Sequence, residues 1–265
     1  MTDAWTTPRR LLLLAVGALA VVFLVAPMFV IVPMSFTQAP ILSWPPEGFS
    51  TRWFQKMLTD PQWTRGFANS AQVAVLTALV AATVGTLAAL GIVRGRFPGR
   101  SVVNALFLSP LIVPVVIVGI GFFSFYARLR LVGTLPGLVL AHTALAIPFV
   151  VVNVGTALRT MDRNLELAAA NLGANPIRVF WRITFPIILP GVFAGALFAF
   201  ITSWDEVVVS IFMTSARFRT LPVEMWEQVR QVVDPTVAAV ATSLMAVTTT
   251  MLVLVFVVRR QSPVR

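Results

Sequence analysis

Several kinds of chemistry are excluded by residues that this chain lacks or carries only once. Its 265 residues include no cysteine, so neither a disulfide nor a thiolate metal site can form. The one lysine, Lys56, has no glycine-rich phosphate loop before it. The one histidine, His142, lacks the spacing of a zinc hydrolase, and a lone histidine within an apolar run is more often a packing residue or an interhelix hydrogen-bond partner than a metal ligand. We therefore expect no enzymatic, cofactor or metal site on this chain.

Charged residues are also scarce. They make up 11% of the chain, against 58% hydrophobic residues, and the mean hydropathy is +0.88, which is far more apolar than a soluble domain. The net charge of +10 comes mainly from arginines that fall in short clusters between long apolar runs. That pattern is typical of the loops of a protein embedded in a lipid bilayer and argues against a nucleic-acid partner.

Six apolar runs approach or exceed the length of about 20 residues that a helix needs to cross the hydrocarbon core. The first could be a signal peptide, but it is longer than a signal core and further spans follow it, so we expect an uncleaved span. Arg52–Thr59 is expected to form an interfacial helix. The predicted fold is all-α, one membrane domain over residues 1–265, with spans at about 11–34, 67–93, 102–126, 134–157, 186–210 and 236–258.

The distribution of arginines predicts the orientation of these spans. The short turn at residues 94–100 carries three arginines and no acidic residue, so by the positive-inside rule it lies in the cytoplasm. Both termini and the loop at residues 160–185 then lie on the same side. No soluble domain is expected.

The loop at residues 160–185 carries signals for two short helices. Asp162 can cap the first helix, and Gly173 suits the left-handed residue that ends it. Asn175-Pro176 is typical of an N-cap followed by proline at the first helical position. We expect two amphipathic helices joined by a tight turn, which would make a docking element; an ordinary cytoplasmic loop is the alternative.

The same loop resembles the cytoplasmic signature of ABC importer permeases, which reads Glu-Ala-Ala, three residues, Gly, nine residues, Ile-x-Leu-Pro. Leu167 takes the glutamate position, with Glu166 one residue earlier, and Phe185 takes the leucine position. Five residues stand at the matching spacings: Ala168, Ala169, Gly173, Ile183 and Pro186. The resemblance implies docking on a separate ATPase, and the residues that it assigns to this coupling are Glu166, Ala168, Ala169, Gly173, Ala174, Asn175, Pro176, Phe180, Ile183 and Pro186.

Residues 11–258 as a whole resemble the permease subunits of spermidine/putrescine-type importers, most clearly at 109–110, 200–210 and 220–223. Such permeases lie in the bacterial inner membrane with a sister permease, two ATPase subunits and a periplasmic solute-binding protein. The resemblance implies type I permease architecture, ATP and Mg bound by the ATPase subunits, no cofactor on this chain, and a small solute. It favours a polyamine such as putrescine or spermidine.

Polar residues in apolar surroundings predict the solute path. Trp204, Asp205 and Glu206 lie between two apolar runs, and paired carboxylates beside an indole would suit an organic cation. The start of a solvated outer loop is the alternative. Tyr126 and Asn153 are weaker candidates, for which hydrogen bonding between helices is the alternative.

The predicted function is therefore the membrane-spanning permease subunit of an ATP-driven importer. The first four spans and the sixth carry no charge, so an ion-coupled mechanism lacks the buried carboxylates that it usually needs. Two alternatives remain at this point: a self-sufficient secondary transporter or channel for a small solute, and a membrane scaffold that transports nothing.

Overall fold

The computed structural model describes residues 7–231 and 234–260, and the regular elements over these ranges are helical, without a strand. Five of the helices are long and apolar enough to span a membrane, or six if one bent pair counts as a span. The chain divides into two compact units, Met1–Asp60 with Glu227–Met245, and Pro61–Trp226 with Ala246–Arg265. The expected all-α membrane fold is confirmed.

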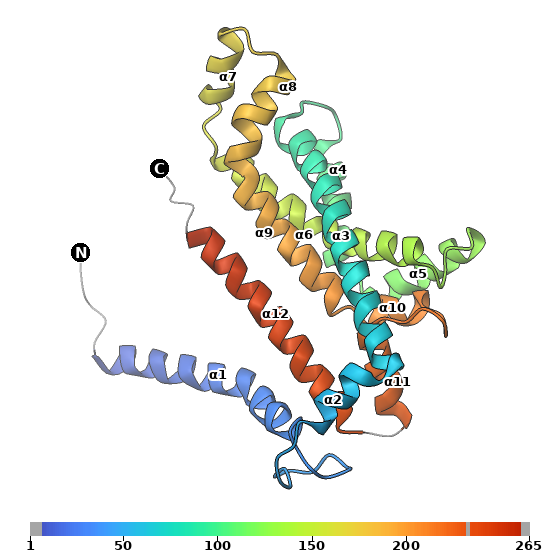
Figure 1. The fold of residues 1–265 in the computed structure, drawn as a ribbon. Coiled ribbons are helices and arrows are strands. Elements are labelled where there is room, and N and C mark those ends of the chain that lie inside the picture. The colour runs from blue at the N-terminus through green and yellow to red at the C-terminus, as the bar shows by residue number, and fades with distance from the viewer. Residues whose placement is uncertain (1–6, 232–233, 261–265) are drawn as a thin grey trace. The chain divides into compact units, whose positions relative to one another are not determined.

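The first unit contains α1 (Thr7–Met34), α2 (Arg52–Thr59) and the first part of α12 (Thr236–Arg260) (Figure 1). α1 presents leucine, valine and phenylalanine side chains all round and buries almost none of them, as expected of a helix that meets lipid. α2 has the bounds that we expected. It is held by Trp53, whose Nε1–H donates to the carbonyl of Thr37 at 2.8 Å.

The second unit is built around α3 (Pro61–Arg94), α6 (Leu135–Thr160) and α9 (Phe185–Trp204). The side chains between these helices are apolar and several of them are alanine, and one core cluster takes residues from all three helices. Val150 of α6 lies at its centre. A β-carbon added to Gly85 of α3 would come within 2.7 Å of the Val150 side chain, and one added to Gly195 of α9 within 2.9 Å of its Cα. Glycine at these two positions lets the helix backbones approach closely, as is common between membrane helices.

The third predicted span is broken. α4 (Arg100–Leu108) and the 3₁₀ turn η1 (Ser109–Leu111) are followed by α5 (Val115–Arg128), and the two halves meet at 103°. Pro114 explains where the helix breaks, because a proline cannot continue the hydrogen-bond ladder and disfavours helical geometry in the residue before it.

The fifth span differs from the prediction at both ends. It is preceded without a gap by α8 (Pro176–Val179) and η2 (Phe180–Thr184), a π-helical turn. The π-turn is closed by a hydrogen bond from the Phe185 N–H to the Phe180 carbonyl, immediately before Pro186, which has no N–H to donate. At its far end α9 stops at Trp204, and α10 (Val208–Met213) is a separate short helix.

Candidate functional site

The loop between α6 and α9 forms a helical hairpin, which Figure 1 shows projecting beyond the start of α9. Its first helix is α7 (Asn164–Asn171), and the Asp162 carboxylate accepts a hydrogen bond from the Asn164 N–H at 2.9 Å. The helix therefore begins one or two residues later than we expected, while Asp162 still satisfies a backbone donor at its start.

The turn of the hairpin has a defined geometry. Gly173 has a φ of +84°, its N–H donates to the Ala170 carbonyl at 2.9 Å, and the Ala174 N–H donates to the Ala169 carbonyl at 3.1 Å. These two bonds are those of a Schellman motif, in which a left-handed residue ends the helix. On the other side Asn175 accepts a hydrogen bond from the Arg178 N–H at 2.8 Å, and Pro176 occupies the first helical turn. The sequence predicted both caps correctly.

The hairpin exposes apolar side chains that its own unit does not cover. Leu172 at the tip is 90% exposed, Ile177 71% and Trp181 59%. Ala168 is exposed on α7 as well. Large apolar groups at the surface of a polar loop commonly mark a protein contact. The hairpin is therefore suited to binding another protein.

The base of the hairpin is packed against the helices of the second unit. Ile183 packs on the core cluster around Val150. Phe180 and Trp181 pack edge to face with 5.0 Å between ring centroids, and Phe180 lies 5.8 Å from Phe185. Pro186 lies exposed in the first turn of α9. The coupling residues predicted from sequence thus fall on an exposed tip and a packed base.

Glu166 lies at this base and faces inward. Its Oε2 is 3.3 Å from the Arg94 guanidinium at the end of α3, and its Oε1 accepts a hydrogen bond from the Thr184 hydroxyl at 2.8 Å. Thr184 is buried, and the other two side chains are mostly covered. Neither Arg94 nor Thr184 was singled out from sequence, because both contacts join segments that are distant along the chain or separated by a turn.

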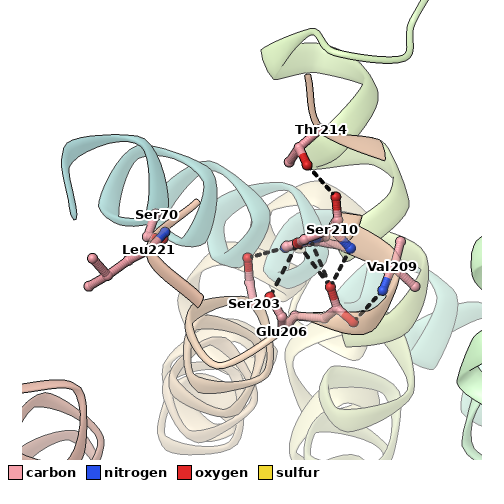
Figure 2. Close-up of polar contacts among 8 residues, drawn as sticks. Ser70, Ser203, Glu206, Val209, Ser210, Thr214 and Leu221 are labelled. Carbon is pink, nitrogen blue, oxygen red and sulfur yellow. Dashed lines mark hydrogen bonds and ion pairs between the residues drawn. The ribbon is translucent and has the colours of Figure 1, made fainter. Parts of the chain in front are cut away.

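A second polar cluster lies where α9 gives way to α10. The Glu206 carboxylate accepts hydrogen bonds from the backbone N–H groups of Val209 at 2.7 Å and Ser210 at 2.8 Å, which caps α10 (Figure 2). The His142 ring from α6 lies 2.8 Å from the Ser203 hydroxyl and 3.0 Å from that of Ser210. The interhelix role expected of His142 is confirmed. All four polar side chains are buried.

Both carboxylate oxygens of Glu206 already accept hydrogen bonds within this cluster, so they are not free to bind a solute. In the structure, Trp204 is also buried, packed edge to face on Phe67 of α3 at 5.3 Å. Asp205, in contrast, is exposed and accepts a hydrogen bond from the Thr248 hydroxyl at 3.2 Å. The pair of adjacent carboxylates that we expected to work together is thus divided between the interior and the surface.

The two weaker path candidates lie apart from this cluster. Tyr126 of α5 stacks on Phe122 with 5.5 Å between ring centroids. Asn153 of α6 donates to the Phe149 carbonyl at 2.8 Å and lines an open cavity of about 340 Å³ between α6 and α9, together with Thr156, Pro190 and Gly191. Asn153 therefore combines a polar group with access to a cavity. The solute path itself stays a prediction.

Another cavity, of about 470 Å³, lies between the start of α3 and the segment before α11 (Leu221–Gln231). Three arginines line it, Arg65, Arg217 and Arg219, and Glu224 lies 3.7 Å from Arg219. The lining is basic overall and does not suit an organic cation.

The bundle of apolar helices and the capped hairpin between α6 and α9 together define an integral membrane permease. The chain belongs to the family described as "Binding-protein-dependent transport system inner membrane component", whose model matches residues 81–263. Members of this family are the non-catalytic permease subunits of ABC importers, so the chain is a multi-pass membrane protein of this kind. The alternatives of a self-sufficient transporter and a scaffold are thereby set aside.

Two curated relatives point to the same subgroup. The chain is 34% identical over 244 residues to the putrescine transport system permease protein PotI of Escherichia coli K12, covering 89% of this chain and 85% of that protein. It is 28% identical over 232 residues to the spermidine/putrescine transport system permease protein PotC of the same organism, covering 87% of each. The resemblance noted in the sequence is confirmed.

The fold also matches a solved importer. A chain of a bacterial ABC transporter involved in the import of the acidic polysaccharide alginate superposes with a TM-score of 0.70 at 16% identity, covering 99% of this chain and 100% of that one. At this identity the likeness concerns the fold alone. It agrees with the type I importer permease architecture that we predicted.

Proposed function

We propose that the hairpin at residues 160–185 docks on a separate ATPase subunit and transmits its motion to the spans. The observation that carries this proposal is a turn held by caps on both sides with exposed apolar side chains at its tip. A rigid tip of this kind can enter a groove without first being ordered, so little conformational entropy is lost on binding.

A binding measurement tests the docking. Leu172→Asp places a charge on the most exposed apolar residue of the tip and should prevent the ATPase subunit from co-purifying with the membrane complex. Leu172→Met keeps the apolar contact and should bind normally. Normal co-purification of the aspartate variant would contradict the docking proposal.

We propose a polyamine such as putrescine or spermidine as the solute. Support comes from the substrates named for the two curated relatives, and from Asp205, an exposed carboxylate at the end of α9. Uptake of labelled putrescine by cells that express the complete importer should saturate and be suppressed by excess spermidine, with a dicarboxylate as the control competitor. Suppression by the dicarboxylate in place of spermidine would overturn the assignment.

The proposed assembly contains a second, different permease subunit, two ATPase subunits and a periplasmic solute-binding protein. It is supported by the family and by the solved alginate transporter, which was determined in complex with a solute-bound periplasmic protein. ATP and Mg would bind to the ATPase subunits and no cofactor to this chain. Both termini and the hairpin would face the cytoplasm of the bacterial cell, an orientation that the arginines of the 94–100 turn favour by the positive-inside rule.

A further inference from the structure

The contacts of Glu166 join both arms of the hairpin and the end of α3. Glu166 belongs to α7, Arg94 is the last residue of α3, and Thr184 lies in the π-turn that leads into α9. Each carboxylate oxygen of Glu166 is used, Oε2 by Arg94 and Oε1 by Thr184. A single side chain of α7 thus contacts both the second arm of the hairpin, at Thr184, and the end of α3, at Arg94.

We propose that Glu166 is a positioning residue that clamps the docking hairpin to the Arg94 end of α3. The hairpin is covalently continuous with α6 and α9, but α3 is linked to it through no neighbouring stretch of chain. With the clamp in place, a displacement of the hairpin reaches α3 together with α9. Without it, the hairpin can shift while α3 stays behind. This inference rests on the docking function proposed above.

The position of Glu166 on its helix supports an inward role. Leu167, which takes the glutamate position of the family signature, is 51% exposed, whereas the Glu166 side chain is 19% exposed. Successive residues of an α-helix are rotated by about 100°, so moving the acid back by one residue turns it from the surface toward α3. The departure from the signature is the one that an internal contact requires.

The electrostatics point the same way. The Arg94 side chain is 23% exposed, and both its Nε and the Nη2 that faces Glu166 are buried without a hydrogen-bond partner among the described residues, so the contact with Glu166 is an ion pair. Glu166 supplies the negative charge nearest to this guanidinium. A mostly buried pair is screened less by salt and water than a surface pair, and removing one partner leaves the other uncompensated. The geometry therefore makes the hairpin position sensitive to the charge at residue 166.

The absence of cysteine permits a direct test of the clamp. Spin labels on cysteines placed at two exposed positions, Gly91 of α3 and Ala170 of α7, report the separation of hairpin and α3 in the full complex. We expect a narrow distance distribution in the parent protein and a broader one in Glu166→Gln. The exchange of Arg94→Glu with Glu166→Arg should narrow it again. Arg163→Gln, which removes an exposed charge from the same hairpin, is the matched control and should leave it unchanged.

A second readout concerns coupling. Glu166→Gln should lower the solute imported per ATP hydrolysed by at least threefold while the ATPase subunit still co-purifies, and the exchange variant should recover most of this loss. An unchanged distance distribution in Glu166→Gln would overturn the clamp. Loss of ATPase binding in that variant, unrepaired by the exchange, would instead make Glu166 a direct contact. Failure of docking itself would appear separately, as normal binding by Leu172→Asp.

Discussion

The His142 ring of α6 and the Glu206 carboxylate, in the break between α9 and α10, approach to 3.5 Å, and both are almost fully buried. Glu206 also accepts two backbone hydrogen bonds at the start of α10, so its charge is held by α6 and α10 together. This contact fixes the break between α9 and α10. It makes Glu206 a residue of the interior in this structure.

Truncating either member of this pair should destabilise the protein. Glu206→Ala leaves the backbone N–H groups of Val209 and Ser210 without their acceptor, and an unsatisfied buried donor costs about 1–3 kcal/mol. We expect a clearly lower thermal unfolding temperature in detergent for Glu206→Ala. Asp205→Asn, at the exposed neighbour, is the control and should unfold close to the parent. Similar unfolding of the two variants would show that the buried contacts contribute little.

Asp205 and Glu206 were predicted to line the solute path together, and a variant of Asp205 tests the exposed member separately. If Asp205 lines the solute path, Asp205→Asn should reduce uptake of a cation several-fold without changing the amount of folded protein, because it removes an exposed charge. The measurement is initial uptake normalised to purified complex. Unchanged uptake would remove Asp205 from the path and leave Asn153 as the candidate nearest a cavity.

Gly173 should tolerate asparagine and reject valine. A left-handed backbone strains a β-branched residue, and the cost is of order 1–3 kcal/mol, whereas asparagine adopts this conformation more readily. No atom of the described residues lies within 4 Å of a β-carbon added to Gly173, so the strain comes from the backbone conformation. We expect Gly173→Val to uncouple ATP hydrolysis from uptake and Gly173→Asn to retain coupling. The measurement is the ratio of solute imported to ATP hydrolysed, and equal ratios would contradict the role of the turn.

Gly195 should not tolerate even a methyl group. Its added β-carbon would approach the Val150 Cα within 2.9 Å, so α6 and α9 would have to separate. Overpacking of a tight core costs about 1–3 kcal/mol. Gly91→Ala, on the exposed side of α3 where nothing lies near, should instead be neutral or slightly stabilising. Thermal unfolding in detergent compares the two, and equal effects would mean that this helix contact adapts.

The pH dependence of the first unit should follow Asp234. Burial raises the pKa of this carboxyl, but hydrogen bonds from Lys56 and Thr236 and the charge of Lys56 outweigh it, so the pKa lies below the ordinary value of 3.8. A lowered pKa means that the contact stabilises the fold above about pH 4 and is lost as the pH falls through the folded value. The gain is modest because Lys56 is 44% exposed. The free energy of unfolding measured between pH 3 and 6 should depend less on pH in Asp234→Asn than in the parent protein. An unchanged pH dependence would count against a contribution from this pair.

Local signals explain most of what the sequence predicted. The caps at Gly173 and Asn175 depend on a few neighbouring residues, so the sequence alone could predict them, whereas Asp162 lies one residue before the N-cap of α7. The apolar runs located the spans because length and composition alone decide membrane crossing. The third span was expected to be a single helix over about 102–126, and the sequence did not predict the bend of 103° that follows from the break at Pro114.

The remaining features depend on contacts between distant segments. Nothing near Glu206 in the sequence indicates that His142 will meet it, and its place beside Asp205 suggested a shared role in the solute path. Likewise the sequence shows Arg94 only as one arginine of a basic turn, and its ion pair with Glu166 depends on how α3 packs beside the hairpin. Pairings of this kind arise from helix packing, which composition and periodicity do not specify.

The π-turn between Phe180 and Thr184 contains one residue more than the corresponding α-helical turn, and it lies where the docking hairpin joins the fifth span. Were that turn to tighten into ordinary α-helix, everything on its hairpin side would rotate by about 100° about the helix axis and advance by about 1.5 Å. The π-turn therefore gives this connection a way to convert a displacement of the hairpin into a rotation relative to the fifth span.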